Sequence, residues 1–159
     1  MSNLLEFFEH NCWANQRLLE HCARLPAEAL DKSVPGTYGS IIETLRHLGG
    51  AEERYLSYLE DRPHRRELWE KAKLDLPRLQ ETALDRAARW RELLAVEPDP
   101  AAVLVRKNPD GSEDRLTTRT CLVQAIHHGN DHRTHICTVL GAVGLEVPDL
   151  DAWHFYEES

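Results

Sequence analysis

"RTCLVQAIHHGNDHRTHICTVLGAV", residues 119–143, decides the fold, because a helical pattern runs through it and four of the chain's nine histidines lie within 127–135. Residues three and four apart lie on one face of a helix. His127 points about 100° away from His128, since each residue turns a helix by that angle. The predicted face therefore carries Cys121, Ala125, His128, His132, His135 and Val139.

Three further helices are predicted where apolar residues recur at steps of three or four, over residues 3–24, 40–59 and 76–96. The second of these begins with Ser40 followed three residues later by Glu43. This spacing is typical of a capping box, in which the two side chains satisfy free backbone N–H groups at the helix start. We therefore expect a helix to begin at Ser40.

The segments between these helices lack the helical pattern. Residues 25–40 hold two prolines and two glycines and predict a loop with a short turn. The polar residues 60–75 predict a connection containing a partial helix, and residues 144–159 predict a loop and tail. Residues 101–118 alternate around "NPDG", which indicates a β-hairpin or extended excursion.

These elements indicate an all-α protein, an antiparallel four-helix bundle with a short extended or hairpin excursion between helices three and four. A chain of 159 residues is near the usual size of one hydrophobic core, so we expect a single domain over 1–159. With 42% hydrophobic and 29% charged residues, the composition is that of a globular chain.

Charge and composition exclude several classes of protein. A net charge of -8 argues against nucleic-acid binding, which needs a basic face, and the short basic run at 62–67 is typical of a solvated loop. We expect no membrane span, because no stretch of about 18 apolar residues occurs. The N-terminal sequence also lacks the basic start and apolar run of a signal peptide.

The cysteines indicate a reducing, cytoplasmic environment. Two of them lie within the first predicted helix and two within the fourth, without C-x-x-C spacing, which is not the pattern of a disulfide framework. We expect them to be small buried hydrophobic residues, with Cys121 lining a pocket at most. The four are Cys12, Cys22, Cys121 and Cys137.

A metal site is one interpretation of the histidines. His128 and His132 have the spacing with which two imidazoles on a helix hold one divalent ion, although chance alone gives roughly 0.5 such pairs in this chain. A third candidate is His47, beside the apolar face of the second helix and just before Gly49 and Gly50. Helical glycines are tolerated where something approaches closely. The alternative is that these histidines pack, face water or bond a carbonyl.

Three stretches in order, "CWANQRLLE" (12–20), "LRHLGGAEERYL" (45–56) and "IHHGNDHRTHICTVLGAVGLEVPDLD" (126–151), resemble the DinB/YfiT-like family. The resemblance covers essentially the whole chain and is weakest in the middle third. Its most specific part is a histidine, a glycine, two variable positions and then histidine and arginine. This pattern is matched by His128, Gly129, His132 and Arg133.

The resemblance implies that His47, His128 and His132 are the ligands of a divalent metal, usually zinc or nickel. It implies either a transferase in which the metal activates a low-molecular-weight thiol or a metal-dependent hydrolase in which hydroxide attacks. It also implies a homodimer acting on a small-molecule substrate. The chain departs from the family at Asp131, where a further histidine is common. It departs again at residues 134–135, where Gly-Gln is common, which leaves the substrate open. A bundle that holds metal without catalysis is the alternative.

Other polar residues near these positions have open roles. His135 is either a fourth ligand, a proton acceptor or a polar pocket wall. Glu52 interrupts an apolar face and is a candidate to hold a histidine tautomer through a hydrogen bond. Arg133 is expected to anchor a carboxylate or a helix end. Asn11 and Asn15 either face the pocket or cap buried groups.

Overall fold

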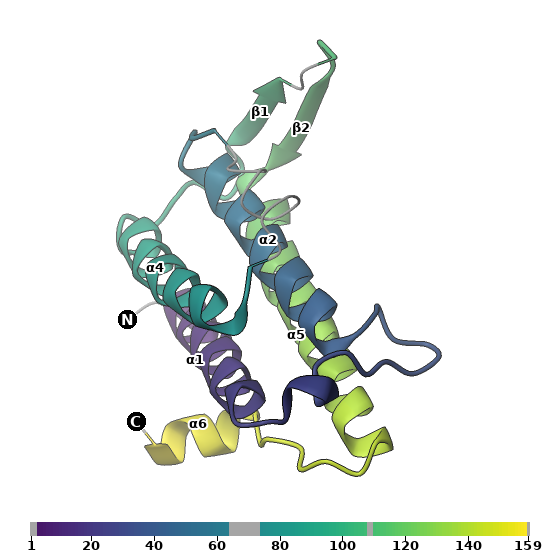
Figure 1. Ribbon diagram of the computed structural model, residues 1–159. Coiled ribbons are helices and arrows are strands. Elements are labelled where there is room, and N and C mark those ends of the chain that lie inside the picture. Colours follow the sequence, from purple (N-terminus) through teal and green to yellow (C-terminus); the bar gives the residue numbers. More distant parts are fainter. Residues whose placement is uncertain (1–2, 64–73, 108–109, 159) are drawn as a thin grey trace.

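The computed structural model describes residues 3–63, 74–107 and 110–158. Four long helices form the bundle, as the sequence predicts (Figure 1). Helix α1 packs on α4, and α2 packs on α5. The helices are α1 (Asn3–Ala23), α2 (Ile41–Leu59), α4 (Leu76–Ala95) and α5 (Thr118–Ala142). No helix within the described ranges is long and apolar enough to cross a membrane.

The starts of the helices follow local sequence signals. Ser40 accepts a hydrogen bond from the backbone N–H of Glu43, whose side chain accepts one from the Ser40 backbone, so the predicted capping box at α2 is confirmed. Asp75 caps α4 and Thr117 caps α5 through side-chain acceptors. These caps satisfy backbone donors that have no partner within the helix.

The excursion between α4 and α5 is an antiparallel hairpin of β1 (Val103–Lys107) and β2 (Glu113–Thr117), which confirms the prediction. Two of the four "NPDG" residues, at 108 and 109, lie outside the described residues. The hairpin stands at the end of the bundle where α2 ends (Figure 1). Tyr58 of α2 donates a hydrogen bond of 2.8 Å to Asp114 of β2 and so ties the hairpin to the bundle.

The C-terminal prediction was wrong in part, because residues Ala152–Glu158 form a short helix, α6, in place of a tail. Its first turn is closed by Asp151, which accepts a hydrogen bond of 2.9 Å from the His154 backbone. Phe155 packs against Trp13 of α1, with ring centroids 5.5 Å apart. A helix of two turns is too short to show a periodic pattern, so the sequence did not indicate it. The contact that holds it comes from a distant part of the chain.

Of the two connections predicted in the first half of the chain, the structure describes one fully and the other only in part. The loop at 25–40 holds the expected short turn, a 3-10 helix at Ala27–Ala29 called η1. The partial helix expected within 60–75 and most of the basic run at 62–67 fall on residues 64–73, which lie outside the described residues.

The apolar core is divided into two clusters. On each long helix a buried polar residue lies between the positions that contribute to one cluster and those that contribute to the other: Asn15, Glu52, Arg86 and Arg133. The first cluster is built around Leu18, Ile41, Leu45, Leu79, Ile136 and Leu140. The second is built around Phe8, Leu56, Trp90, Leu94 and Leu122.

The order of these positions gives the helix directions. Along α2 and α4 the first cluster precedes the second, whereas along α1 and α5 the second precedes the first. Helices α1 and α4 are therefore antiparallel, and so are α2 and α5 (Figure 1). A facing antiparallel pair brings side chains from distant parts of the chain together, which is how helical bundles build sites.

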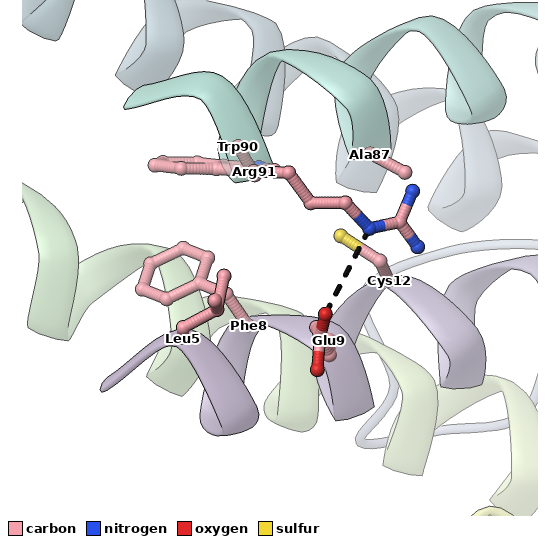
Figure 2. A pocket seen from close by; sticks show the side chains of 7 residues that line it. All are labelled: Leu5, Phe8, Glu9, Cys12, Ala87, Trp90 and Arg91. Carbon is pink, nitrogen blue, oxygen red and sulfur yellow. Dashed lines mark ion pairs between the residues drawn. The ribbon is translucent and has the colours of Figure 1, made fainter. Parts of the chain in front are cut away.

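An apolar crevice lies between α1 and α4 (Figure 2). An ion pair of 3.9 Å between Arg91 and Glu9 crosses it. The indole N–H of Trp90 is buried and has no hydrogen-bond partner among the described residues. The lining residues are Leu5, Phe8, Glu9, Cys12, Ala87, Trp90 and Arg91. The crevice belongs to the second core cluster and contains no histidine.

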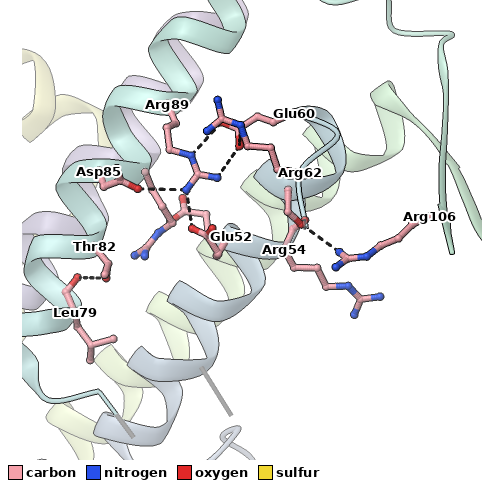
Figure 3. A network of polar contacts seen from close by, with 12 residues as sticks. Glu52, Arg54, Glu60, Arg62, Leu79, Thr82, Asp85, Arg89 and Arg106 are labelled. Carbon is pink, nitrogen blue, oxygen red and sulfur yellow. Dashed lines mark hydrogen bonds and ion pairs between the residues drawn. The ribbon is translucent and has the colours of Figure 1, made fainter. Parts of the chain in front are cut away.

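Arg89 joins α4 to α2 through an ionic cluster (Figure 3). Its guanidinium donates hydrogen bonds of 2.7 Å to Glu60 and to Glu53, and one of 3.2 Å to Asp85 on its own helix. The hydrogen bonds that Arg89 donates to Glu60 and Glu53 raise its pKa, so it remains charged. The cluster fixes α4 against the helix that carries His47.

Helices α1 and α5 approach each other at Gly129. A Cβ added there would lie 2.5 Å from the Asn11 Oδ1. We therefore expect Gly129→Ala to destabilise the protein by about 1–3 kcal/mol, the usual effect of forcing atoms into a packed interior. Alanine's helix preference of roughly 0.5–1 kcal/mol opposes only part of this. Urea unfolding monitored by circular dichroism measures the change.

Gly141→Ala is the matched control, because Gly141 is also in α5 but an added Cβ there would make an ordinary contact of 3.5 Å with Val147. Here the helix preference of alanine acts alone, and we expect stabilisation of up to about 1 kcal/mol. Equal effects of the two substitutions would contradict a close approach at Gly129.

Candidate metal centre

Three histidines converge between α2 and α5. His47 comes from α2, and His128 and His132 come from successive turns of α5. One ring nitrogen of each lies within 4.8 Å of the others, and the Nε2 atoms of His47 and His128 are 3.0 Å apart. The three residues that the sequence singled out as a candidate site are thus brought together.

The histidines are held in their neutral form. Burial lowers the pKa of His128 to about 4, and positive charge on His132 and His47 would lower it further. Burial likewise lowers the pKa of His132 to about 4, with the charges of His47 and His135 acting in the same direction. Burial also lowers the pKa of His47. At neutral pH all three rings therefore offer lone pairs.

The group fits a divalent metal ion. Nitrogen ligands of zinc lie about 2.0–2.1 Å from the ion and hence about 3.3 Å from each other in a tetrahedral site. The Nε2 atoms of His47 and His128 are 3.0 Å apart, close to this value, and no ligand nitrogen of the group is more than 4.8 Å from another. The Nδ1 atom of His132 is buried with no hydrogen-bond partner among the described residues. Imidazole nitrogen is a ligand that suits zinc and nickel.

Tyr38 lies against the group, and sequence reasoning missed it. Its hydroxyl lies 3.0 Å from the Nδ1 of His47, and its ring stacks on that imidazole with centroids 4.1 Å apart. The ring also meets His132 edge-on at 5.0 Å. The tautomer in which Nδ1–H donates to this hydroxyl oxygen leaves the Nε2 lone pair free for a metal. Tyr38 lies in the predicted loop before α2, and no local pattern there marks it.

The other two histidines of the 127–135 stretch lie beside the group. The ring of His135 is 5.4 Å from that of His132, but His135 does not belong to the set of ligand atoms within 4.8 Å, so the geometry does not support a fourth ligand. His127 is exposed and lies 3.2 Å from Asp131. Its position outside the group agrees with the angle expected from the helix.

Glu52 does not hold a histidine tautomer, so that expectation was wrong. Within the described chain, its hydrogen bonds go to Asn11, Asn15 and Arg86. Arg133 donates to the side-chain oxygens of Asn11 and Asn15 instead of to a carboxylate or a helix end. These partners come from other helices, and the sequence alone does not show which side chains meet.

The cysteines are free, as the sequence predicts. Cys121 is fully buried, and its Sγ lies 3.5 Å from the backbone carbonyl of Tyr55. Burial raises the pKa of Cys121 to about 12 and that of Cys22 to about 12. Burial also raises the pKa values of Cys12 and Cys137. None of the four is suited to act as a thiolate nucleophile at neutral pH.

Comparison with known proteins gives one family. The sequence matches the DinB family over residues 1–159, the whole chain. The chain has no significant match among curated proteins. The family match agrees with a helical bundle in which His47, His128 and His132 form one group that can hold a metal ion. On the strength of this full-length match, the chain belongs to the DinB family.

Proposed function

We propose that this protein binds a divalent metal ion, zinc or nickel, through His47, His128 and His132 and uses it in a transferase or hydrolase reaction. The observation that carries the proposal is the convergence of three neutral imidazoles between two helices. Protein sites with three ligands are typical of catalytic metals, because they leave a coordination position for a small molecule.

A divalent cation in this group supplies Lewis acidity, which lowers the pKa of a thiol or water near it. The chain's own residues contribute the orientation and the neutral state of the ligands. Tyr38 holds the His47 ring by stacking and by its hydroxyl contact. Burial keeps His128 and His132 neutral, so protons do not compete for their lone pairs.

We propose a low-molecular-weight thiol as the co-substrate. The four cysteines of the chain are free, but burial raises their pKa values and makes them poor nucleophiles. A thiol that reacts at this centre would therefore have to be supplied by a small molecule. Hydrolysis, in which water replaces the thiol, is the second reaction that the same centre would allow.

We further propose a cytoplasmic homodimer. Free cysteines favour a reducing compartment. A contact between helix faces is supported by exposed apolar side chains on three helices, Phe7, Leu84 and Val123. The net charge of -8 speaks against a nucleic-acid partner. Light scattering at several protein concentrations tests the dimer, and a monomer mass throughout would overturn it.

Turnover assays test the catalytic proposal. Protein loaded with zinc or nickel is assayed with several small thiols and electrophiles, and with activated esters and amides for hydrolysis. We expect turnover by the unmodified protein and its loss in His47→Ala, because His47 is a proposed ligand. His127→Ala is the control, since that residue is exposed and outside the group. Metal-loaded protein without turnover on any pair would instead favour a non-catalytic, metal-holding bundle.

A further inference from the structure

A buried polar layer crosses the bundle beside the histidine group. It contains Asn11 and Asn15 of α1, Glu52 of α2, Arg86 of α4 and Arg133 of α5, all of which are at most 5% exposed. Removing charged groups from water is unfavourable, so a layer of this kind is weak evidence for added stability. Its best-attested role elsewhere is to fix how helices sit against one another.

The two asparagines bridge the charged residues. The Nδ2 groups of Asn11 and Asn15 donate to the same Glu52 oxygen at 3.0 and 3.2 Å. Their Oδ1 atoms both accept from one guanidinium nitrogen of Arg133 at 2.7 Å. An ionised glutamate only accepts and an arginine only donates, so the bridging side chain must do both. Asparagine meets this requirement, whereas leucine and aspartate do not.

The bridge connects the two helices that carry the histidine group. Arg133 directly follows His132 on α5, and adjacent helical residues point about 100° apart, so fixing one direction fixes the other. Glu52 lies on α2, five residues after His47. Gly129, next to His128, has no Cβ, and this is what lets the Asn11 oxygen approach α5. The rotation of both helices is therefore set by their bonds to α1.

We propose that Asn11 and Asn15 are positioning residues for the metal centre. Through Glu52 and Arg133 they hold α2 and α5 in the rotation that places the three imidazoles against one another. They act through these partners without touching the ion. This inference rests on the proposed metal binding and adds to it a distinct requirement on α1, a helix that contributes none of the three histidines.

The test uses the double variant Asn11→Leu/Asn15→Leu and measures its affinity for Co²⁺ and the visible absorption spectrum of the bound Co²⁺. This absorption reports the geometry of the ligands. We expect the affinity to fall roughly 10- to 100-fold, as when partners of metal ligands are removed, and the absorption bands to shift or broaden. Leu79→Ala is the matched control. Leu79 is 1% exposed and lies on α4, which carries no proposed ligand, so its loss lowers stability without breaking the bridge.

The outcomes separate the two proposals. An unchanged Co²⁺ affinity and spectrum in the double variant would overturn the positioning role, and so would an equal fall in Leu79→Ala at a similar urea midpoint. Failure of the unmodified protein to bind Co²⁺ would overturn the metal function itself. If the double variant does not fold, the same Co²⁺ measurements are made on a variant whose polar layer is replaced entirely by apolar residues. Replacing all members of an ionic network is often tolerated. That variant is Asn11→Leu, Asn15→Leu, Glu52→Met, Arg86→Met and Arg133→Met, with the same loss expected.

Discussion

The variant His128→Ala is expected to remain folded and to bind Zn²⁺ on the order of 1000-fold more weakly than the unmodified protein. This loss of affinity exceeds the roughly 10- to 100-fold loss that is typical when only a hydrogen-bond partner of a metal ligand is removed. The reason is that His128 contributes one of three converging ring nitrogens. Competition with a chromophoric chelator measures the affinity, and metal analysis after dialysis measures the stoichiometry.

Thermal unfolding tests the same prediction by a second measurement. Zinc at about 100 times its dissociation constant should stabilise the unmodified protein by about 2.7 kcal/mol, and a chelator should reverse this. His128→Ala should show little of either effect, whereas His127→Ala should behave as the unmodified protein, because His127 lies outside the group. Equal zinc content in both variants, or near-zero content in the unmodified protein, would defeat the proposed centre.

The second large effect is expected for Glu52→Ala, which should lower the free energy of unfolding by about 3–5 kcal/mol, as when one partner of a buried pair is removed. The substitution takes the acceptor from Asn11, Asn15 and Arg86 together. The Arg86 guanidinium, 3% exposed, would remain buried without its carboxylate. Urea unfolding monitored by circular dichroism measures the loss.

Glu9→Ala is the control for this prediction. The Glu9 carboxylate also pairs with an arginine, Arg91, but at 3.9 Å and with both side chains partly exposed. Pairs of this kind contribute about 0–1 kcal/mol. A loss below about 1 kcal/mol in Glu52→Ala, equal to that of the control, would show that the buried layer is not held together as described.

The long elements could be predicted from the sequence because their signals are local. The apolar period of 3.6 residues and the Ser40–Glu43 pair lie within single segments, and the structure reproduces the helices that they indicate. Helix α6 was missed for the complementary reason. It has seven residues and is held by the contact of Phe155 with Trp13, which no short window of sequence contains.

The candidate site divides in the same way. His128 and His132 share a face by spacing alone, and His47 was a candidate from its place beside the apolar face of its helix. Its assignment as a ligand came from the family resemblance, because the pairing depends on how α2 meets α5. Tyr38 was not predicted, since the path of the loop before α2 is set by tertiary packing. For Glu52 the burial could be suspected from its apolar neighbours, but its asparagine partners on α1 could not.

The division of the apolar interior by a polar layer has a consequence for variation in this chain. Side chains such as Leu56 and Leu79 belong to different clusters. Substitutions without shared partners usually combine additively. The two halves of the interior can thus accept changes of size independently during evolution, while the layer between them resists change because each of its members has partners on another helix.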